Sequence, residues 1–224
     1  MDTMVHEFIH SYSNPAVDKF AAQMEKPAGQ INAPVHRAMQ RQGYGGWKAL
    51  LYESMVRAST IQYIIDHEGT DAGRRQIREE NSRSFVWMDK LCDLLGAYRK
   101  NRQQYTTFES FMPRVVSFFD DLASHAPQVV STTVPDGARD VDPKLTEIVV
   151  KFSQPMSTAN WNTDPRFQMG RFDAAATVLT IPVALDPDHE YELPLQWPNG
   201  SPLASAAGAP MQTVTLKFRT RKES

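Results

Sequence analysis

The sequence has 224 residues, 41% of them hydrophobic and 22% charged, which is the composition of a globular rather than a disordered protein. Its 24 basic and 26 acidic residues give a net charge of −2, so nothing points to nucleic acid or an anionic membrane as a partner. The single cysteine, Cys92, excludes an internal disulfide and a multi-cysteine zinc site, and no apolar run approaches the ~20 residues of a membrane-spanning helix.

The first predicted element is a helix that carries the sequence His6-Glu7-Phe8-Ile9-His10. In a helix, the i, i+4 spacing places both imidazoles on one face, where they can bind one Zn²⁺ ion. Glu7 lies beside them, placed to accept a proton from a metal-bound water. The pattern is therefore an HExxH zinc motif, with His6 and His10 as predicted ligands and Glu7 as predicted general base.

An ordinary core helix is the competing interpretation of the same segment. Its apolar residues follow the i, i+3, i+4, i+7 spacing of a buried helix face: Val5, Phe8, Ile9 and Tyr12. The two histidines would then simply face the core. Asn14-Pro15 predicts a helix break and restart, and we expect a loop rich in Gly and Pro to follow and to end in Gly43-Tyr44-Gly45-Gly46.

A long helix is predicted from about Trp47 to His67, and it offers the third metal ligand. Glu53 is an acidic residue within a largely apolar stretch, where a carboxylate is costly to bury unless it is paired or metal-bound. Arg57 follows one helical turn later and can orient it. We therefore predict Glu53 as the third ligand; the alternative is a simple Glu53–Arg57 surface pair.

Three other glutamates are weaker rivals for that role. Glu68, Glu79 and Glu80 lie in the charged segment 66–83, which we expect to be solvated. A hydrolytic site also needs a donor to the developing oxyanion, commonly Tyr, His or Arg. The candidates are Tyr44, His67, Tyr98 and Tyr105, and spacing favours none of them. Further helices are predicted over 85–98, which includes a buried Cys92, and over 108–122.

The second part of the chain is predicted to be β-rich, because eleven of the 15 prolines follow residue 126. Strands are expected at 147–152, 167–172, 177–181, 190–195 and 212–219, separated by turn residues. We predict an α plus all-β protein of two domains, a helical domain over 1–126 and a β-sandwich over 127–224. Trp161 and Trp197 are expected to be isolated core or surface residues, with a ligand-binding face as the alternative.

The helical part resembles a known family in three segments: HEFIHSYSNP, YESMVRA and SFVWMDKLCDLLGAYRKNRQQYTTFESFMPRVVSFF. Over about residues 2–124 it is similar to an uncharacterised bacterial family of HExxH proteins that look like zinc peptidases of the gluzincin type. The resemblance implies His6, His10 and Glu53 as ligands, Glu7 as base and Arg57 as support for Glu53. The familiar gluzincin helix has Asn before the Glu and Asp four residues after it, where this sequence has Tyr52 and Arg57.

The β-rich part resembles the bacterial Ig-like domain of surface-layer and other cell-envelope proteins. The similar segments are VPDGARDVDP at 134–143 and IVVKFSQPM at 148–156, within a resemblance over about 128–220. It implies a spacer or a module that binds protein or cell-surface glycan, in the periplasm, secreted or on the cell surface. The first residues show no secretion signal. Because a β-sheet precedes the HExxH helix in gluzincins, we expect this chain to be the C-terminal part of a larger peptidase or to have a misassigned start site.

The function predicted from the sequence is a zinc metallopeptidase that acts on a peptide or protein and carries an Ig-like accessory domain. Membrane insertion is not expected. One alternative is a non-catalytic cell-envelope protein with a vestigial metal site. Another is a zinc ion that serves only to stabilise the fold.

Overall fold

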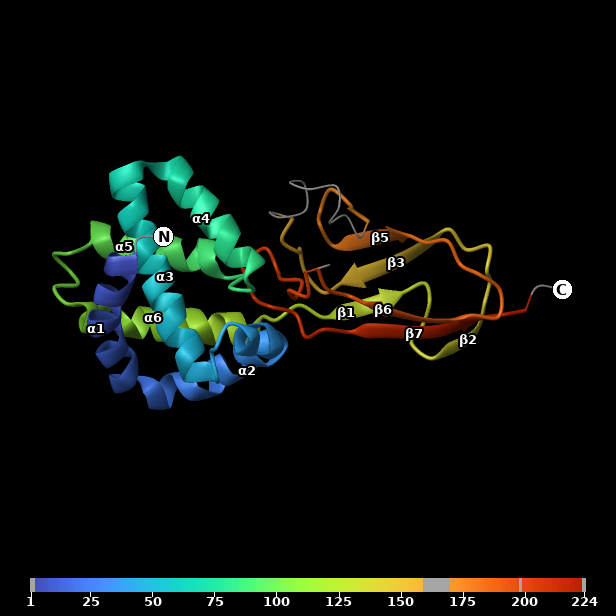
Figure 1. Ribbon diagram of the computed structural model, residues 1–224, viewed down its shortest axis with the longest axis horizontal. Helices are drawn as coiled ribbons and strands as arrows, with labels where there is room; N and C mark the ends of the chain where they lie inside the picture. The colour runs from blue at the N-terminus through green and yellow to red at the C-terminus, as the bar shows by residue number, and fades with distance from the viewer. Residues whose placement is uncertain (1–2, 159–169, 198, 223–224) are drawn as a thin grey trace. The chain divides into compact units, whose positions relative to one another are not determined.

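The computed structural model describes residues 3–158, 170–197 and 199–222, and the chain forms two compact units (Figure 1). The first comprises Met1–Ala126 together with Ala207–Pro210, and the second comprises Pro127–Ala206 and Met211–Ser224. The first unit is helical and the second consists of β-sheets, which confirms the predicted fold class.

The helices of the first unit are α1 (Thr3–Lys19), α2 (Ala21–Arg41), α3 (Trp47–Glu68), α4 (Thr70–Ser82), α5 (Met88–Lys100) and α6 (Phe108–Ser124). Helix α3 contacts α1, α2, α4 and α5, whereas α6 packs mainly on α2. The core between them is apolar, and Met55, Phe85, Trp87 and Phe119 are among its largest fully buried side chains. The helix that carries Glu53 therefore runs through the centre of this unit.

Helix α1 differs from the prediction in two ways. It continues through Pro15, where a break was expected. Its predicted apolar face is also wrong, because Phe8 is 67% and Tyr12 70% exposed. The buried face is instead built around His6, Ser13 and Val17, which share one side of the helix at i, i+7 and i+11. Burial of this face explains why one helix spans the proline.

Helix α2 occupies the segment that was expected to be a loop rich in Gly and Pro. Its buried residues recur at helical spacing: Met24, Pro27, Ala28, Ile31, Val35, Ala38 and Met39. A proline inside a helix costs roughly 3 kcal/mol, whereas burying a single large aliphatic side chain contributes roughly 1.5–3 kcal/mol. Burial of this stripe therefore outweighs the cost of the two internal prolines. The helical spacing of the apolar residues predicts this element better than its proline content does.

The later helices were predicted with partly wrong bounds. Helix α4 lies in the segment 66–83, which was expected only to be charged and solvated. Helix α5 begins at Met88, not at residue 85, because Ser84 takes a positive φ of 77° and turns the chain before it. Cys92 is buried, as predicted, and burial raises the pKa of its thiol strongly.

The short segment Ala207–Pro210 belongs to the helical unit although its neighbours in sequence lie in the β unit. Gly208 adopts φ +86°, and a Cβ there would lie 2.9 Å from the Cα of Trp87. Both the left-handed backbone and the close approach require glycine. This segment departs from the predicted β domain over 127–224, which includes it.

We expect Gly208→Ala to lower the free energy of unfolding of the helical unit by about 1–3 kcal/mol, because it adds backbone strain and a clash with Trp87. The measurement is urea unfolding followed by the helical circular dichroism signal. Gly43→Ala is the matched control: its φ is also positive, at +89°, but a Cβ there meets nothing within 4 Å. Equal losses in the two variants would show that the contact with Trp87 does not contribute.

The second unit has two sheets around one core. Strands β1 (Val129–Thr132), β3 (Glu147–Phe152), β5 (Val178–Pro182) and β4 (Arg171–Phe172) form an antiparallel sheet in that order. Strands β2 (Ala138–Val141), β7 (Thr215–Thr220) and β6 (Glu190–Pro194) form the other, in which β2 and β7 are parallel. Alternate residues of the strands face the shared core, which includes Ile148, Leu179 and Phe218.

Most strands in this unit match their prediction, but β1 and β2 were missed because both are short and half-exposed. The predicted strand at 167–172 is described only in its last part, since 167–169 and Trp161 lie outside the described residues. Trp197 is buried in the core. Among the described residues, no helix is long and apolar enough to cross a membrane.

Candidate metal centre

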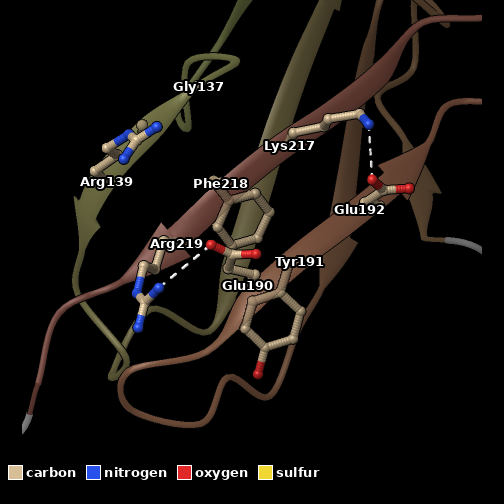
Figure 2. A pocket seen from close by; sticks show the side chains of 9 residues that line it. Gly137, Arg139, Glu190, Tyr191, Glu192, Lys217, Phe218 and Arg219 are labelled. Carbon is tan, nitrogen blue, oxygen red and sulfur yellow. Dashed lines mark hydrogen bonds and ion pairs between the residues drawn. The ribbon is translucent and has the colours of Figure 1, made fainter.

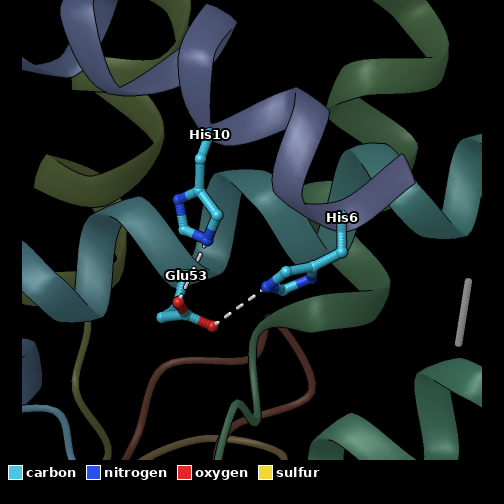
Figure 3. A group of neighbouring side chains, drawn as sticks. All are labelled: His6, His10 and Glu53. Carbon is cyan, nitrogen blue, oxygen red and sulfur yellow. Dashed lines mark ion pairs between the residues drawn. The ribbon is translucent and has the colours of Figure 1, made fainter. Parts of the chain in front are cut away.

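The side chains of His6, His10 and Glu53 converge from two helices (Figure 3). His6 and His10 extend from successive turns of α1, and Glu53 meets them from α3. One potential ligand atom from each residue lies within 4.8 Å of the other two. Glu53 and His6 are each only 8% exposed. The structure thus brings together the three residues that the sequence selected as ligands.

The spacing of these atoms suits a small cation with few ligands. With zinc–ligand bonds of about 2.0–2.2 Å, the donor atoms of a tetrahedral site lie about 3.3–3.6 Å apart. His10 Nε2 lies 3.4 Å from Glu53 Oε1, and His6 Nε2 lies 3.9 Å from Glu53 Oε2. The two distances end on different oxygens of the carboxylate, so a carboxylate that binds through one oxygen requires side-chain rotation to reach this geometry. Two imidazoles and one carboxylate are also a common donor set for catalytic zinc.

The hydrogen bond of His10 favours the tautomer that a metal ligand needs. Its Nδ1 lies 3.3 Å from the side-chain oxygen of Asn14, which is an acceptor. With the proton on Nδ1, the lone pair of Nε2 faces the Glu53 carboxylate, and two acceptors that face each other call for a proton or a cation between them. Metal-binding histidines usually hold their other ring nitrogen in this way.

His6 has a more apolar environment. Burial lowers the pKa of its imidazole, and the neighbouring His10 and Arg57 add to this, whereas Glu53 and Glu7 oppose it. The net effect keeps the ring neutral, the form that binds a metal. Among the residues that the structure describes, its Nδ1 is buried without a hydrogen-bond partner, which departs from the usual support of a metal-binding histidine.

Arg57 holds the Glu53 carboxylate from one helical turn further along α3. Its Nη2 lies 3.1 Å and its Nε 3.2 Å from Glu53 Oε2, which leaves Oε1 directed toward His10. Arg57 is only 4% exposed, and its guanidinium lies over the Phe85 ring at 4.8 Å from the centroid. The surface-pair alternative is therefore wrong: this ion pair is buried.

Of the four predicted oxyanion donors, the structure brings only Tyr44 to this cluster. Its hydroxyl accepts a hydrogen bond from Arg57 Nη2 at 2.7 Å. Burial raises the pKa of Tyr44, the Glu53 carboxylate raises it further, and Arg57 partly offsets both. The hydroxyl thus keeps its proton at neutral pH and can donate it in a hydrogen bond.

The other three candidates have partners elsewhere. The exposed His67 stacks on Tyr63, at 3.9 Å between ring centroids. Tyr98 and Tyr105 both pack against Phe111 on α6, at 5.0 and 4.9 Å.

Glu7 lies on the exposed side of α1, between the two histidines in sequence. Its charge is close enough to raise the pKa of His6 slightly. An exposed carboxylate beside the ligands is accessible to water and to a substrate, as a general base must be.

The glutamates that were considered weaker ligands divide into two kinds. Glu68 and Glu79 are exposed, in agreement with the prediction. Glu80 is 0% exposed, so the expectation that it is solvated is wrong. Its carboxylate forms an ion pair with Arg57 Nη1 and accepts a hydrogen bond from Gln76 at 2.6 Å. Sequence reasoning missed it because its segment is dominated by charged residues.

Two hollows lie apart from these ligands. One, of about 530 Å³, lies beside α1 and is lined by Phe8, Tyr12, Tyr98 and Arg102, among others. The other, of about 210 Å³, lies on the sheet of β2, β7 and β6, beside the stacked rings of Tyr191 and Phe218 (Figure 2). Of its charged side chains, Lys217 pairs with Glu192 at 2.7 Å and Arg219 with Glu190 at 3.3 Å.

Comparisons with known proteins match both parts of the chain. Residues 123–220 match the bacterial Ig-like domain, and residues 1–118 match a domain of unknown function, DUF4932. Neither match is to a peptidase family. No curated protein matches the sequence.

A solved structure that resembles the chain is "Crystal structure of the S-layer protein rSbsC(31-844)", at 13% identity and a TM-score of 0.30. The similarity covers 95% of this chain and 34% of that one, so this chain spans about a third of its length. At this TM-score the similarity supports no argument about fold or function. The family is set by the helical part: since residues 1–118 are more than half of the sequence, the chain belongs to the DUF4932 family.

Proposed function

We propose that the helical part is a zinc-dependent hydrolase that cleaves peptide bonds, and that the Ig-like domain is its accessory module. The proposed ligands are His6, His10 and Glu53, and the proposed general base is Glu7. The observation that carries the proposal is the convergence of the three ligand side chains within 4.8 Å, from two helices and in a largely buried place. Only the two histidines are close in sequence, so local helix spacing does not account for the third.

The residues around the ligands have distinct roles in this proposal. A bound zinc ion would supply Lewis acidity, which lowers the pKa of a water and polarises the substrate carbonyl. Glu7 accepts the proton of the attacking water and passes it to the leaving amine. Arg57 fixes the Glu53 carboxylate, and the Tyr44 hydroxyl, 2.7 Å from Arg57, donates a hydrogen bond to the developing oxyanion.

The first experiment measures metal content and hydrolysis together. We expect elemental analysis of the purified protein to find one zinc per chain, and EDTA to abolish cleavage of a peptide library. The same elemental analysis distinguishes zinc from iron, because two histidines and one carboxylate also form the usual non-haem Fe(II) site. A folded protein that takes up no divalent metal would contradict the proposal.

The same measurements separate the proposal from a structural zinc site. In that case chelation lowers the melting temperature, and no peptide or casein is hydrolysed with zinc bound. A non-catalytic envelope protein, the remaining alternative, would bind its partner through the Ig-like domain with or without zinc. Glu7 is exposed on α1, so water can reach its carboxylate as the hydrolase requires, and the hydrolysis assay decides between the roles.

A further inference from the structure

Glu80 is a fully buried carboxylate that the proposed chemistry does not use directly. It is 0% exposed, although it comes from a helix whose other charged residues face solvent. Burial of an unpaired carboxylate costs several kcal/mol. The structure compensates this cost with two donors, Arg57 from α3 and Gln76 from the preceding turn of α4. Removing one partner of such a buried pair leaves an uncompensated charge, which is strongly unfavourable.

The backbone after α4 brings Glu80 and Phe85 to the same arginine. Ser84 has a positive φ of 77°, which folds the chain back so that the Phe85 amide donates to the Glu80 carbonyl at 3.0 Å. The Phe85 ring then lies against the Arg57 guanidinium, and the Glu80 carboxylate binds its Nη1. Arg57 is thereby fixed on the side opposite its contacts with Glu53.

The second cation near Glu80 contributes little to this arrangement. Arg83 Nη1 is 3.9 Å from Glu80 Oε1, but its side chain is largely exposed and forms a closer pair with Glu79, at 2.5 Å. Solvent screens an ion pair of that kind. Within the part of the chain that the structure describes, the buried charges around the ligands are therefore the carboxylates of Glu53 and Glu80 against the guanidinium of Arg57.

This balance determines how much negative charge the centre offers to a metal. A guanidinium paired with Glu53 alone would neutralise the one charged ligand. With Glu80 also bound to Arg57, the two carboxylates exceed the guanidinium by one negative charge. We infer that Glu80 is a positioning residue of the metal centre, which holds Arg57 against Glu53 and offsets its charge so that the centre binds a divalent cation.

The inference rests on the proposed function, in which His6, His10 and Glu53 bind zinc. Its test is the zinc dissociation constant at 25 °C, measured by competition with a chromophoric chelator. For Glu80→Gln, which keeps the shape and removes the charge, we expect zinc binding about 10–100-fold weaker, the usual cost of losing outer support of a metal site. Glu79→Gln is the matched control, since this neighbouring glutamate is exposed, and its affinity should not change.

If Glu80 only stabilises the fold, Glu80→Gln lowers the melting temperature but leaves the zinc affinity of the folded protein unchanged. A zinc affinity equal to that of the unsubstituted protein would therefore overturn the inference. Glu80→Asp keeps the charge, so we expect its affinity to stay within about tenfold of the unsubstituted protein, even if Glu80→Gln does not fold. A larger loss in Glu80→Asp would also overturn it. If the unsubstituted protein takes up no zinc, the proposed function fails. If it binds zinc but the Glu80 variants do not show the expected affinities, this inference alone fails.

Discussion

Glu7→Gln is expected to reduce peptide hydrolysis by about 10²–10⁴-fold while the zinc content stays unchanged, because glutamine fills the same space but cannot accept the proton of the attacking water. Glu7 is exposed on α1, so the substitution should leave the fold and the ligands in place. The readouts are kcat with a peptide substrate and zinc per chain by elemental analysis. The loss should appear in kcat more than in KM, because proton transfer belongs to the transition state.

The control for this substitution is Glu25→Gln, which removes an exposed carboxylate from α2 and should leave kcat unchanged. Full hydrolysis by Glu7→Gln with zinc bound would show that another group acts as the base. Loss of zinc from the same variant would mean that Glu7 helps to bind the metal, which would also contradict the assigned role.

The convergence of His6, His10 and Glu53 could be predicted from the sequence because each part of it is a local signal. His6 and His10 are one helical turn apart, and helix geometry alone places them on one face. Glu53 was selected because a carboxylate within an apolar stretch needs a partner, and Arg57 one turn later supplied it. Both arguments hold within a single helix. Only the contact between α1 and α3 required the tertiary structure.

The arrangement around Arg57 could not be predicted in the same way. Glu80 and Tyr44 reach it from α4 and from the loop before α3, and nothing in their local sequence points to burial. Glu80 lies in a charged segment, where the average residue is solvated, and its burial depends on a turn at Ser84 that only the folded chain reveals. Residues that contact a buried arginine from distant parts of the chain produce no periodic pattern in the sequence.

The errors in the predicted fold are of two opposite kinds. The stretch that became α2 was interpreted as a loop from its prolines, although Met24, Ile31 and Val35 recur at helical spacing. In α1 the opposite occurred: an apolar pattern including Phe8 was taken for the core face, whereas His6 is the buried residue. A polar group can face the core when the interior supplies its partners, here Glu53 and His10.

Glu53→Gln and His10→Ala are expected to weaken zinc binding by more than about 100-fold each, since each removes a ligand and loss of an outer partner alone costs about 10–100-fold. The two residues lie on different helices, and His10 Nε2 approaches Glu53 Oε1 at 3.4 Å. Glu53→Gln keeps an oxygen for Arg57, whose charge is still balanced by Glu80, so the protein should remain folded. The measurements are the zinc dissociation constant and the melting temperature with and without EDTA.

His36→Ala is the matched control, because His36 is a half-buried histidine on α2 that contacts Asn32 instead of the metal ligands, and its zinc affinity should not change. The comparison separates two explanations of the contact between α1 and α3. If Glu53 only pairs with Arg57, Glu53→Gln keeps its zinc while His10→Ala loses it, and the third ligand lies elsewhere. If all three residues bind one ion, both variants lose zinc and EDTA no longer shifts their melting temperatures, which is the result that three converging ligand atoms predict.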